Sequence, residues 1–296
     1  MTRRQLLLTA AATPFLDQRV ALAQSRATEF QIGCMTITYS AFPLERALSG
    51  IKNAGYRYVG WGTAHERVPV MDNDAPPATA RLLAAKCREM GLEPVIMFST
   101  VNVEAPDSVA KHRRKLEQAG AAGIPYLITF GKTTAGALEP WIATLKQLGP
   151  MARANNVTVV IKQHGGNTGT GRLCSKILAE VADEGVKMCY DAGIVLDYEK
   201  LDPIPDMQVC WQDVRAFAIK DHRNTPKSQD CAAGFGEIDH YKLLMPLLQT
   251  GRKIPLVCEN IFEPLLPRPA APEGVDVLAR RSREYLEVVV KGLQMA

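Results

Sequence analysis

Charged and imidazole side chains gather at the ends of several apolar segments in the second half of the chain. They are Lys162, His164, Asp191, Lys220, His222 and Glu259. Each lies at the end of, or just after, a short apolar run of the kind that forms a buried strand. Ammonium, imidazole and carboxylate groups brought together can move protons or hold a divalent cation. The pattern therefore predicts an acid–base or metal site.

The spacing of these residues indicates which side chains face the same way. Lys162 and His164 are two residues apart, and so are Lys220 and His222. Alternate residues of an extended strand point to the same side, so each pair is expected to share a face. Glu259 follows an apolar run, where an unpaired carboxylate would be costly. Glu259 is therefore expected to be a functional residue of the site.

The elements that must position these groups alternate along the chain. Strands are predicted at 30–36, 56–61, 92–98, 125–130, 157–162, 186–191, 214–220 and 254–259. Helices are predicted at about 43–54, 76–90, 107–122, 137–155, 171–184, 239–249 and 275–293, with 197–213 as a loop containing a short helix. Alternation of strands and helices favours parallel pairing, and eight repeats over roughly 270 residues indicate a (β/α)₈ TIM barrel. In such barrels the chemistry lies at the carboxyl ends of the strands.

The N-terminal residues 1–23 have the pattern of an export signal. Two arginines, Arg3 and Arg4, precede an apolar stretch, and Ala21-Leu22-Ala23 is a small-x-small cleavage site. The apolar stretch is too short to span a membrane. We therefore expect a twin-arginine signal at 1–23, a single barrel domain at 24–296, and an exported, periplasmic protein.

Charge and cysteine content exclude other classes of protein. Residues 1–23 carry three arginines and one aspartate, so their removal takes two charges from a net charge of only +4. A nearly neutral chain does not favour a nucleic-acid or membrane-surface partner. The seven cysteines lack C-x-x-C spacing, and Cys34, Cys189 and Cys258 lie in apolar runs. We expect buried thiols and no structural disulfide.

The strand ends resemble those of the sugar phosphate isomerase/epimerase family, also called xylose isomerase-like barrels. In that family strands five to eight typically end in E-x-H-G, D-x-G-N, H-x-K-D and a final E, and four of these side chains hold one divalent metal. The aligned segments here are Lys162-Gln-His164-Gly, Asp191-Ala-Gly, Ala218-Ile-Lys220-Asp221 and Glu259. The segments Gly234-Phe-Gly236-Glu and 44–58 are also similar, so the resemblance covers nearly the whole chain after residue 23.

Two of the four metal ligands that the resemblance implies are missing. Lys162 replaces the first glutamate, and Ala218 replaces the histidine. In one alternative the metal set is rebuilt around one Mn²⁺, Zn²⁺, Co²⁺ or Mg²⁺ ion by His164, Asp191, His222 and Glu259. In the other, the site is metal-free, and the ammonium of Lys162 takes the place of the metal between Asp191 and Glu259. We favour the first, because His222 lies two residues beyond Lys220 on the expected face.

The resemblance implies a small-molecule carbohydrate substrate. Members of the family abstract a proton beside a carbonyl, so we expect an isomerase, an epimerase or a related lyase acting on a sugar or keto-sugar. On this resemblance we interpret Glu259 as the catalytic base, with His164 or Lys220 as its acid or oxyanion partner. Trp61, His65 and Asp221 are the expected substrate contacts, although a core position for Trp61 fits equally well. The basic run 111–115, which contains His112, is expected to be a solvated helix face. A homo-oligomer is compatible with the sequence.

Two other functions remain open. A barrel that has lost two metal ligands is compatible with a non-catalytic sugar-binding protein. The same fold family includes apurinic endonuclease-like nucleases. Five histidines and a nearly neutral charge argue against a nuclease, which needs several metals and a polyanion surface.

Overall fold

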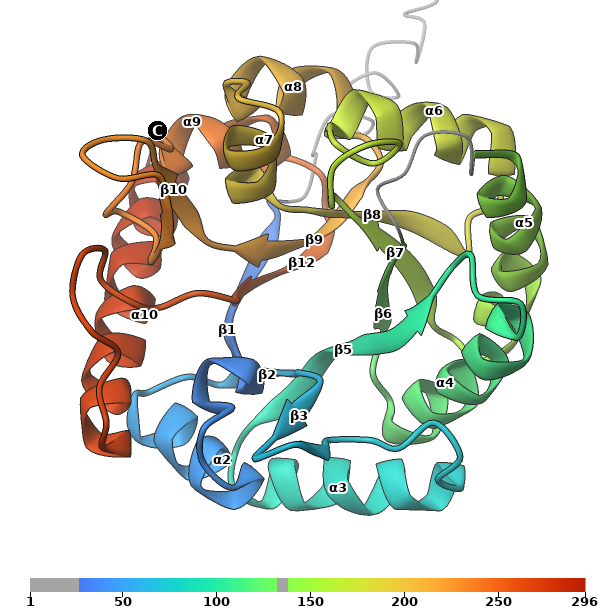
Figure 1. Cartoon of the computed structure of the whole chain (residues 1–296), viewed down its shortest axis with the longest axis horizontal. Coiled ribbons are helices and arrows are strands. Elements are labelled where there is room, and N and C mark those ends of the chain that lie inside the picture. Colours follow the sequence, from blue (N-terminus) through green and yellow to red (C-terminus); the bar gives the residue numbers. More distant parts are fainter. Residues whose placement is uncertain (1–26, 132–137, 296) are drawn as a thin grey trace, which may run out of the picture.

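A closed barrel of parallel strands forms the centre of the molecule (Figure 1). The structure, a computed structural model, describes residues 27–131 and 138–295. Around the barrel the order is β1-β12-β9-β8-β7-β6-β5-β2. The strands are β1 Glu29–Met35, β2 Tyr58–Trp61, β5 Glu93–Asn102, β6 Tyr126–Phe130, β7 Thr158–Lys162, β8 Val186–Tyr190, β9 Val214–Ile219 and β12 Lys253–Cys258. The predicted (β/α)₈ barrel is confirmed. The expected export signal lies outside the described residues.

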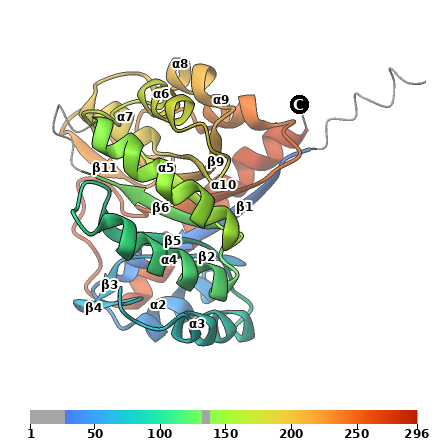
Figure 2. The same cartoon turned by 90° about the vertical axis from the view of Figure 1, so that its right-hand side faces the viewer.

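Helices cover the outside of the barrel (Figures 1 and 2). They are α2 Leu44–Asn53, α3 Pro77–Glu89, α4 Ser108–Ala122, α5 Leu138–Ala154, α6 Gly171–Val181, α7 Ala192–Tyr198, α8 Pro203–Cys210, α9 His240–Leu244 and α10 Pro272–Gln294, with 3₁₀ turns η1 Thr36–Tyr39 and η2 Met245–Leu247. The expected short helix in 197–213 is α8, and its first proline opens the helix. Pro203 occupies the first turn, where a missing N–H costs nothing, and Asp202 caps it by accepting from Ile204 N. In the described ranges no helix is both long and apolar enough to cross a membrane.

The barrel interior is a packed apolar core. Its buried residues are Met35, Val95, Ile96, Phe98, Ile128, Val160, Cys189, Ala216, Ala218 and Val257. A second, larger cluster fills the space between strands and helices and contains Cys34 and Cys258. All seven cysteines are buried free thiols, so the expectation that Cys34, Cys189 and Cys258 are buried is confirmed.

Two short hairpins extend beyond the strand ends. One pairs β3 Ala64–His65 with β4 Val68–Pro69, and the other pairs β10 Asp221–Arg223 with β11 Gln229–Cys231. Because β9 ends at Ile219, Lys220 and His222 do not continue one barrel strand, but both side chains reach the Asp230 carboxylate. The chain turns into the second hairpin at Asp221. There the fully buried Asp221 carboxylate accepts from the backbone N–H groups of His222, Gly234 and Ile238 at 2.8–3.1 Å.

The basic run 111–115 on α4 is not a uniformly solvated face. His112 and Lys115 are buried, with exposed fractions of 0% and 1%. They continue the apolar stripe of Leu116 and Ala119, since residues three and four apart lie on one side of a helix. Lys115 Nζ donates to Met71 O at 2.6 Å. The expectation for these two residues is therefore wrong, because helix periodicity outweighs their polarity.

Buried His112 makes the stability of the fold sensitive to acid. Its Nε2 lies 2.8 Å from Thr129 Oγ1 and its Nδ1 2.9 Å from Ser108 O. Burial, the largest cause, lowers the pKa of His112 to about 4, from the ordinary 6.5. The unfolded chain therefore binds this proton at higher pH than the folded chain. The stabilisation is present above pH 6.5 and is lost as the pH falls toward 4.

We expect His112→Gln to flatten this pH dependence. Between pH 7 and pH 5 the wild type should lose about 2 kcal/mol more free energy of unfolding than the variant, because glutamine takes up no proton. Urea titrations of both proteins at several pH values measure the difference. Equal losses in both proteins would show that His112 does not carry the effect.

Candidate active site

Two lysines and two carboxylates meet at the carboxyl ends of neighbouring strands. Lys162 ends β7, while Asp191, Lys220 and Glu259 directly follow β8, β9 and β12. Lys162 Nζ lies 2.6 Å from Asp191 Oδ2 and 3.4 Å from Glu259 Oε2. Lys220 Nζ lies 3.4 Å from Asp191 Oδ2 and 3.6 Å from Glu259 Oε1. Each ammonium thus contacts both carboxylates, and the four charges balance.

Local backbone structure holds Asp191 in place. It is the N-cap of α7, and its Oδ1 accepts from Ile194 N at 3.1 Å. Its own N–H donates to Gln163 Oε1 at 2.8 Å. The other carboxylate oxygen, Oδ2, is therefore left to face the two lysines. One residue both starts a helix and anchors the charged cluster.

Asp191, Lys162 and Lys220 keep their charges at neutral pH. Burial alone would raise the pKa of Asp191, but the two ammonium groups outweigh burial and lower it. Burial alone would likewise lower the pKa of Lys162 and of Lys220, but Asp191 and Glu259 outweigh it and raise both. Lysines held protonated in this way supply fixed positive charge and do not act as bases.

The side chains are arranged as expected for a site in which the Lys162 ammonium takes the place of the metal. The ammonium of Lys162 lies between Asp191 and Glu259, and Ala218 packs in the barrel core. His164 and His222 do not join these carboxylates. The His164 ring lies 5.2 Å from the Phe130 ring. In the described ranges, three side chains bring possible metal-ligand atoms within 4.8 Å of one another, and they are Asp197, His222 and Asp230. The favoured set of His164, Asp191, His222 and Glu259 is therefore not brought together.

The residues at the family's metal position do not fit a divalent metal. A protonated lysine that is 5% exposed repels a second cation, and alanine offers no ligand atom. His222 cannot compensate, since the β10–β11 hairpin carries it away from Asp191. The cation at this position is the ammonium of Lys162.

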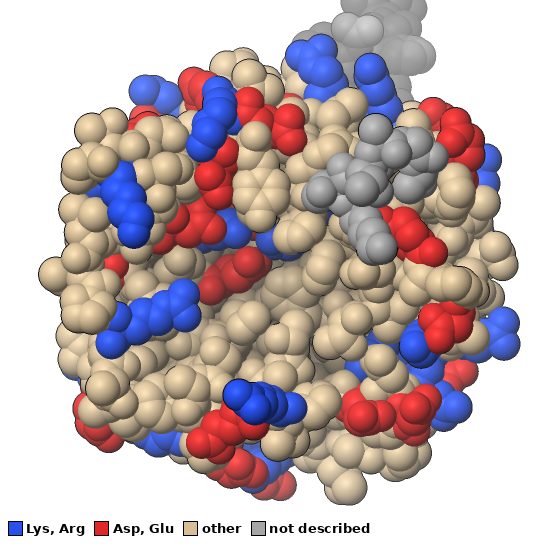
Figure 3. All heavy atoms as spheres, viewed as in Figure 1, with Lys and Arg blue, Asp and Glu red and all other residues tan. Residues whose placement is uncertain are grey.

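A cavity of about 310 Å³ opens beside the charged cluster. It is lined by Ile37, Thr38, Ser40, Lys220, Asp230, Glu259, Asn260, Phe262 and Arg268. Figure 3 shows the hollow at the centre of this face, with charged atoms in it among uncharged ones. Hydroxyl, amide and charged groups against two apolar side chains suit a small polyhydroxylated molecule.

Sequence reasoning missed three residues near this cavity: Asp197, Asp230 and Arg268. They lie on a helix, a hairpin and a loop beyond the strand ends, where spacing rules do not apply. The Arg268 guanidinium lies over the Phe262 ring at 4.3 Å. The one sequence signal near Asp230 is the Gly234-Phe-Gly236-Glu segment that follows it.

His164 lies in an aromatic setting. Its ring is 5.2 Å from that of Phe130 and 5.9 Å from that of Tyr198. Burial, followed by the charges of Lys162 and Lys220, lowers the pKa of His164 below its usual value. The ring is therefore neutral at pH 7 and has one donor and one acceptor nitrogen.

The three expected substrate contacts are placed elsewhere. Trp61 is fully buried in the core between strands and helices, so it offers no face to a sugar. His65 Nδ1 lies 2.8 Å from Phe42 O, and the residue lines a different cavity of about 280 Å³. Both oxygens of Asp221 are taken by backbone N–H groups of the loop that it holds. The expected contacts at Trp61 and Asp221 are therefore wrong, because both side chains are held in the interior by structural partners. His65 lines a cavity, and its role as a substrate contact stays a prediction.

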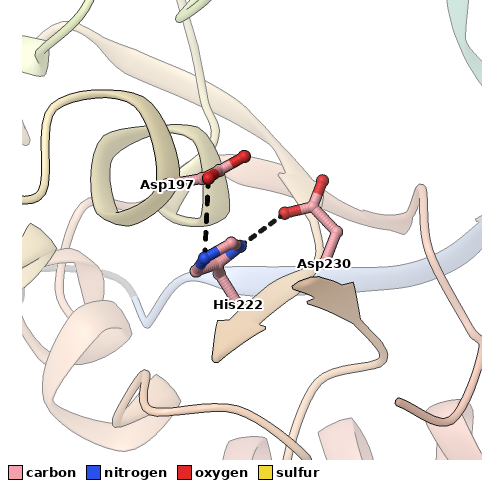
Figure 4. A group of neighbouring side chains, drawn as sticks. All are labelled: Asp197, His222 and Asp230. Atoms are coloured by element: carbon pink, nitrogen blue, oxygen red, sulfur yellow. Dashed lines mark hydrogen bonds and ion pairs between the residues drawn. The ribbon is translucent and has the colours of Figure 1, made fainter. Parts of the chain in front are cut away.

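A second polar group lies next to the cluster. His222 Nδ1 is 2.9 Å from Asp230 Oδ1, and His222 Nε2 is 3.5 Å from Asp197 Oδ1 (Figure 4). Asp197 comes from α7, while His222 and Asp230 face each other across the β10–β11 hairpin. Lys220 Nζ, 3.4 Å from Asp230 Oδ2, connects this group to the inner cluster.

Comparison with known proteins points to one family. A family model described as xylose isomerase-like TIM barrel matches residues 48–281. A search of curated proteins found no match.

Solved structures share the fold at low sequence identity. The structure of L-ribulose 3-epimerase is 15% identical, with a TM-score of 0.70 over 89% of this chain and 95% of that chain. A xylose isomerase-like TIM barrel protein from Mycobacterium smegmatis in complex with magnesium is 14% identical, with a TM-score of 0.69 over 89% and 97%. The probable 3-DHS dehydratase AsbF from Bacillus anthracis is 11% identical, with a TM-score of 0.66 over 87% and 98%.

Proposed function

The chain belongs to the xylose isomerase-like TIM barrel family, and on that premise we propose that it is an isomerase or epimerase of a sugar or keto-sugar. The proposal is carried by one observation. The Glu259 carboxylate lines a cavity together with Lys220, and buried Lys162 adds a second fixed positive charge beside it. This arrangement pairs a base with cations where a carbonyl compound would bind.

The reaction starts with proton removal next to a carbonyl. Glu259 takes the proton from the carbon atom, and the electrons move onto the carbonyl oxygen to give an enediolate. The ammonium groups of Lys220 and Lys162 stabilise that oxygen anion, as preorganised charge does in a site with little water. The proton of the neighbouring hydroxyl group passes to that oxygen anion, and Glu259, now protonated, returns its proton to the former carbonyl carbon, so the neighbouring oxygen becomes the new carbonyl and the isomerisation is complete.

Epimerisation needs a proton donor on the opposite face of the enediolate. His164 is our candidate, because its neutral ring carries one N–H group near the same strand ends. Elimination of a hydroxyl group begins with the same proton removal, so a lyase is a close variant. The names of two structural neighbours, an epimerase and a probable dehydratase, support this range of reactions.

The substrate class follows from the cavity. Its volume and its hydroxyl, amide and charged lining suit a small carbohydrate. Within this proposal the twin-arginine pattern of residues 1–23 supports a periplasmic location and therefore an unphosphorylated sugar as the substrate.

Solvent exchange tests the proposal whichever product forms. Pentoses, hexoses, their 2- and 3-keto forms and keto-aldonates are incubated with the protein in D₂O, and proton NMR follows the C–H signals beside the carbonyl. We expect one group of these compounds to lose such a signal and to give an isomer or epimer. A sugar-binding protein would instead raise its melting temperature with a sugar and leave every C–H signal intact, which would overturn the proposal.

A further inference from the structure

We propose that Asp197, His222 and Asp230 form a binding site for a divalent transition-metal ion, Zn²⁺ by preference, outside the family's metal position. One ligating atom from each side chain lies within 4.8 Å of the other two. Imidazole nitrogen with carboxylate oxygen is a donor set that suits Zn²⁺. The site is independent of the proposed isomerase or epimerase reaction.

Two of the ligand atoms already have the separation that a zinc ion requires. His222 Nε2 lies 3.5 Å from Asp197 Oδ1. Ligands about 2.05 Å from a tetrahedral ion lie about 3.3 Å apart, so an ion fits between these atoms with little movement. Ser228 Oγ is 3.1 Å from the same nitrogen and offers a further oxygen on that side.

Asp230 faces the other nitrogen of the ring. Its Oδ1 lies 2.9 Å from His222 Nδ1, in position to accept the Nδ1–H proton (Figure 4). A carboxylate so placed fixes the tautomer in which Nε2 carries the free lone pair, and it makes that nitrogen a stronger ligand. Asp230 thus acts as the positioning residue of the site, and water completes the coordination.

The group offers two carboxylates to a cation, and each carboxylate also has a lysine within 3.4 Å. Asp197 and Asp230 bring two negative charges to a ring that is 1% exposed. Their nearest lysines are Lys200, 3.4 Å from Asp197 Oδ1, and Lys220, 3.4 Å from Asp230 Oδ2. Lys200 is largely exposed, and Lys220 approaches the Asp230 oxygen that does not face the ring. Lys200 contacts the same Asp197 oxygen that faces His222 Nε2, so an ion has to displace this exposed ammonium from it.

The backbone positions the ligand residues before an ion binds. His222 and Asp230 are paired residues of the β10–β11 hairpin, and buried Asp221 fixes the start of that hairpin. Asp197 comes from α7, whose N-cap is Asp191. Asp197 and Asp230 remain 28% and 32% exposed, so an ion can enter from solvent.

Zinc titration of the full chain, without a histidine tag, tests the site. Isothermal calorimetry with ZnCl₂ should show one equivalent bound. Asp197→Asn should weaken binding at least tenfold, and Asp230→Asn should weaken it about 10–100-fold through loss of ring orientation. Glu259→Gln is the matched control and should bind zinc as the wild type does, because its carboxylate belongs to the inner cluster.

The remaining outcomes are equally decisive. Absence of zinc binding by the wild type would overturn the site. Binding that survives Asp197→Asn but is lost in Glu259→Gln would place the ion at the inner carboxylates and would overturn it as well. Circular dichroism of each variant confirms that it is folded, and partly exposed Asp197 is the substitution with the least risk to the fold. Proton exchange with sugars is measured separately, so failure of the zinc site leaves the proposed reaction standing.

Discussion

Glu259→Gln is expected to abolish exchange of the substrate's acidic proton with solvent. Glutamine keeps the size of the side chain and its contact with the cavity but accepts no proton. A general base typically contributes about 10²–10⁴-fold to the rate, so the variant should fall by at least about two orders of magnitude. The NMR exchange assay in D₂O with any compound that the wild type turns over measures the loss.

Glu263→Gln is the matched control for this change. It is the same substitution four residues further along the chain, and the Glu263 carboxylate pairs with Arg281. Its exchange rate should stay within about twofold of the wild type, since neither Glu263 nor Arg281 lines the cavity and a partly exposed ion pair affects stability only slightly. Full exchange by Glu259→Gln would reject Glu259 as the base.

The sequence was sufficient to predict the barrel because the barrel rests on local patterns. Each barrel strand and each large helix lies within a few residues of its predicted range, whereas the short strands of the two hairpins were not predicted. The helix-terminating glycines at 55, 91 and 123 all have the positive φ of a left-handed C-terminal residue. Apolar runs, helix periodicity and glycine ends are properties of neighbouring residues, and the alternation of elements then decides the architecture.

The strand-end cluster was predictable for the same reason, but its internal pairing was not. Lys162, Asp191, Lys220 and Glu259 follow strands, and a closed barrel brings strand ends together. Whether a metal or the ammonium of Lys162 balances the carboxylates depends on where His222 goes. The position of His222 is set by the end of β9 at Ile219 and by the hydrogen bonds from loop backbone N–H groups to the Asp221 carboxylate. Residue spacing does not reveal such hydrogen bonds.

The prediction failed for residues whose surroundings do not follow from the position of a predicted strand end. Trp61 has the chemistry of a sugar contact, but its environment is set by helices packed against β2. Asp197, Asp230 and Arg268 reach the cavity region from segments that are far apart in sequence. Only the folded chain brings these residues together.

Lys162→Met is expected to cost both stability and activity. It removes the ammonium that lies 2.6 Å from the fully buried Asp191 carboxylate and leaves that carboxylate with Lys220 at 3.4 Å. Removal of one partner of a buried ion pair typically costs 3–5 kcal/mol, and because Lys220 remains we expect about 3 kcal/mol. Loss of charge that stabilises an oxyanion should lower the exchange rate by about 10²–10³-fold.

The double variant Lys162→Met/Asp191→Asn separates these two effects. Asparagine still caps α7, so the double variant should recover most of the lost free energy of unfolding, because no unpaired carboxylate remains. Its exchange rate should nevertheless stay low, since only Lys220 remains beside Glu259 and the ammonium of Lys162 is still missing.

Lys115→Met is the control for removing a buried lysine as such. Lys115 is 1% exposed and donates to Met71 O at a distance from the strand ends, so its loss should affect stability and leave exchange unchanged. If Lys162→Met exchanged at the wild-type rate, Lys162 would be only a structural partner of Asp191. If instead the double variant regained both stability and exchange, the low activity of the single variant would be a consequence of the unpaired carboxylate. Low exchange in a stable double variant would leave the ammonium of Lys162 as the group that takes over the role of the family's metal.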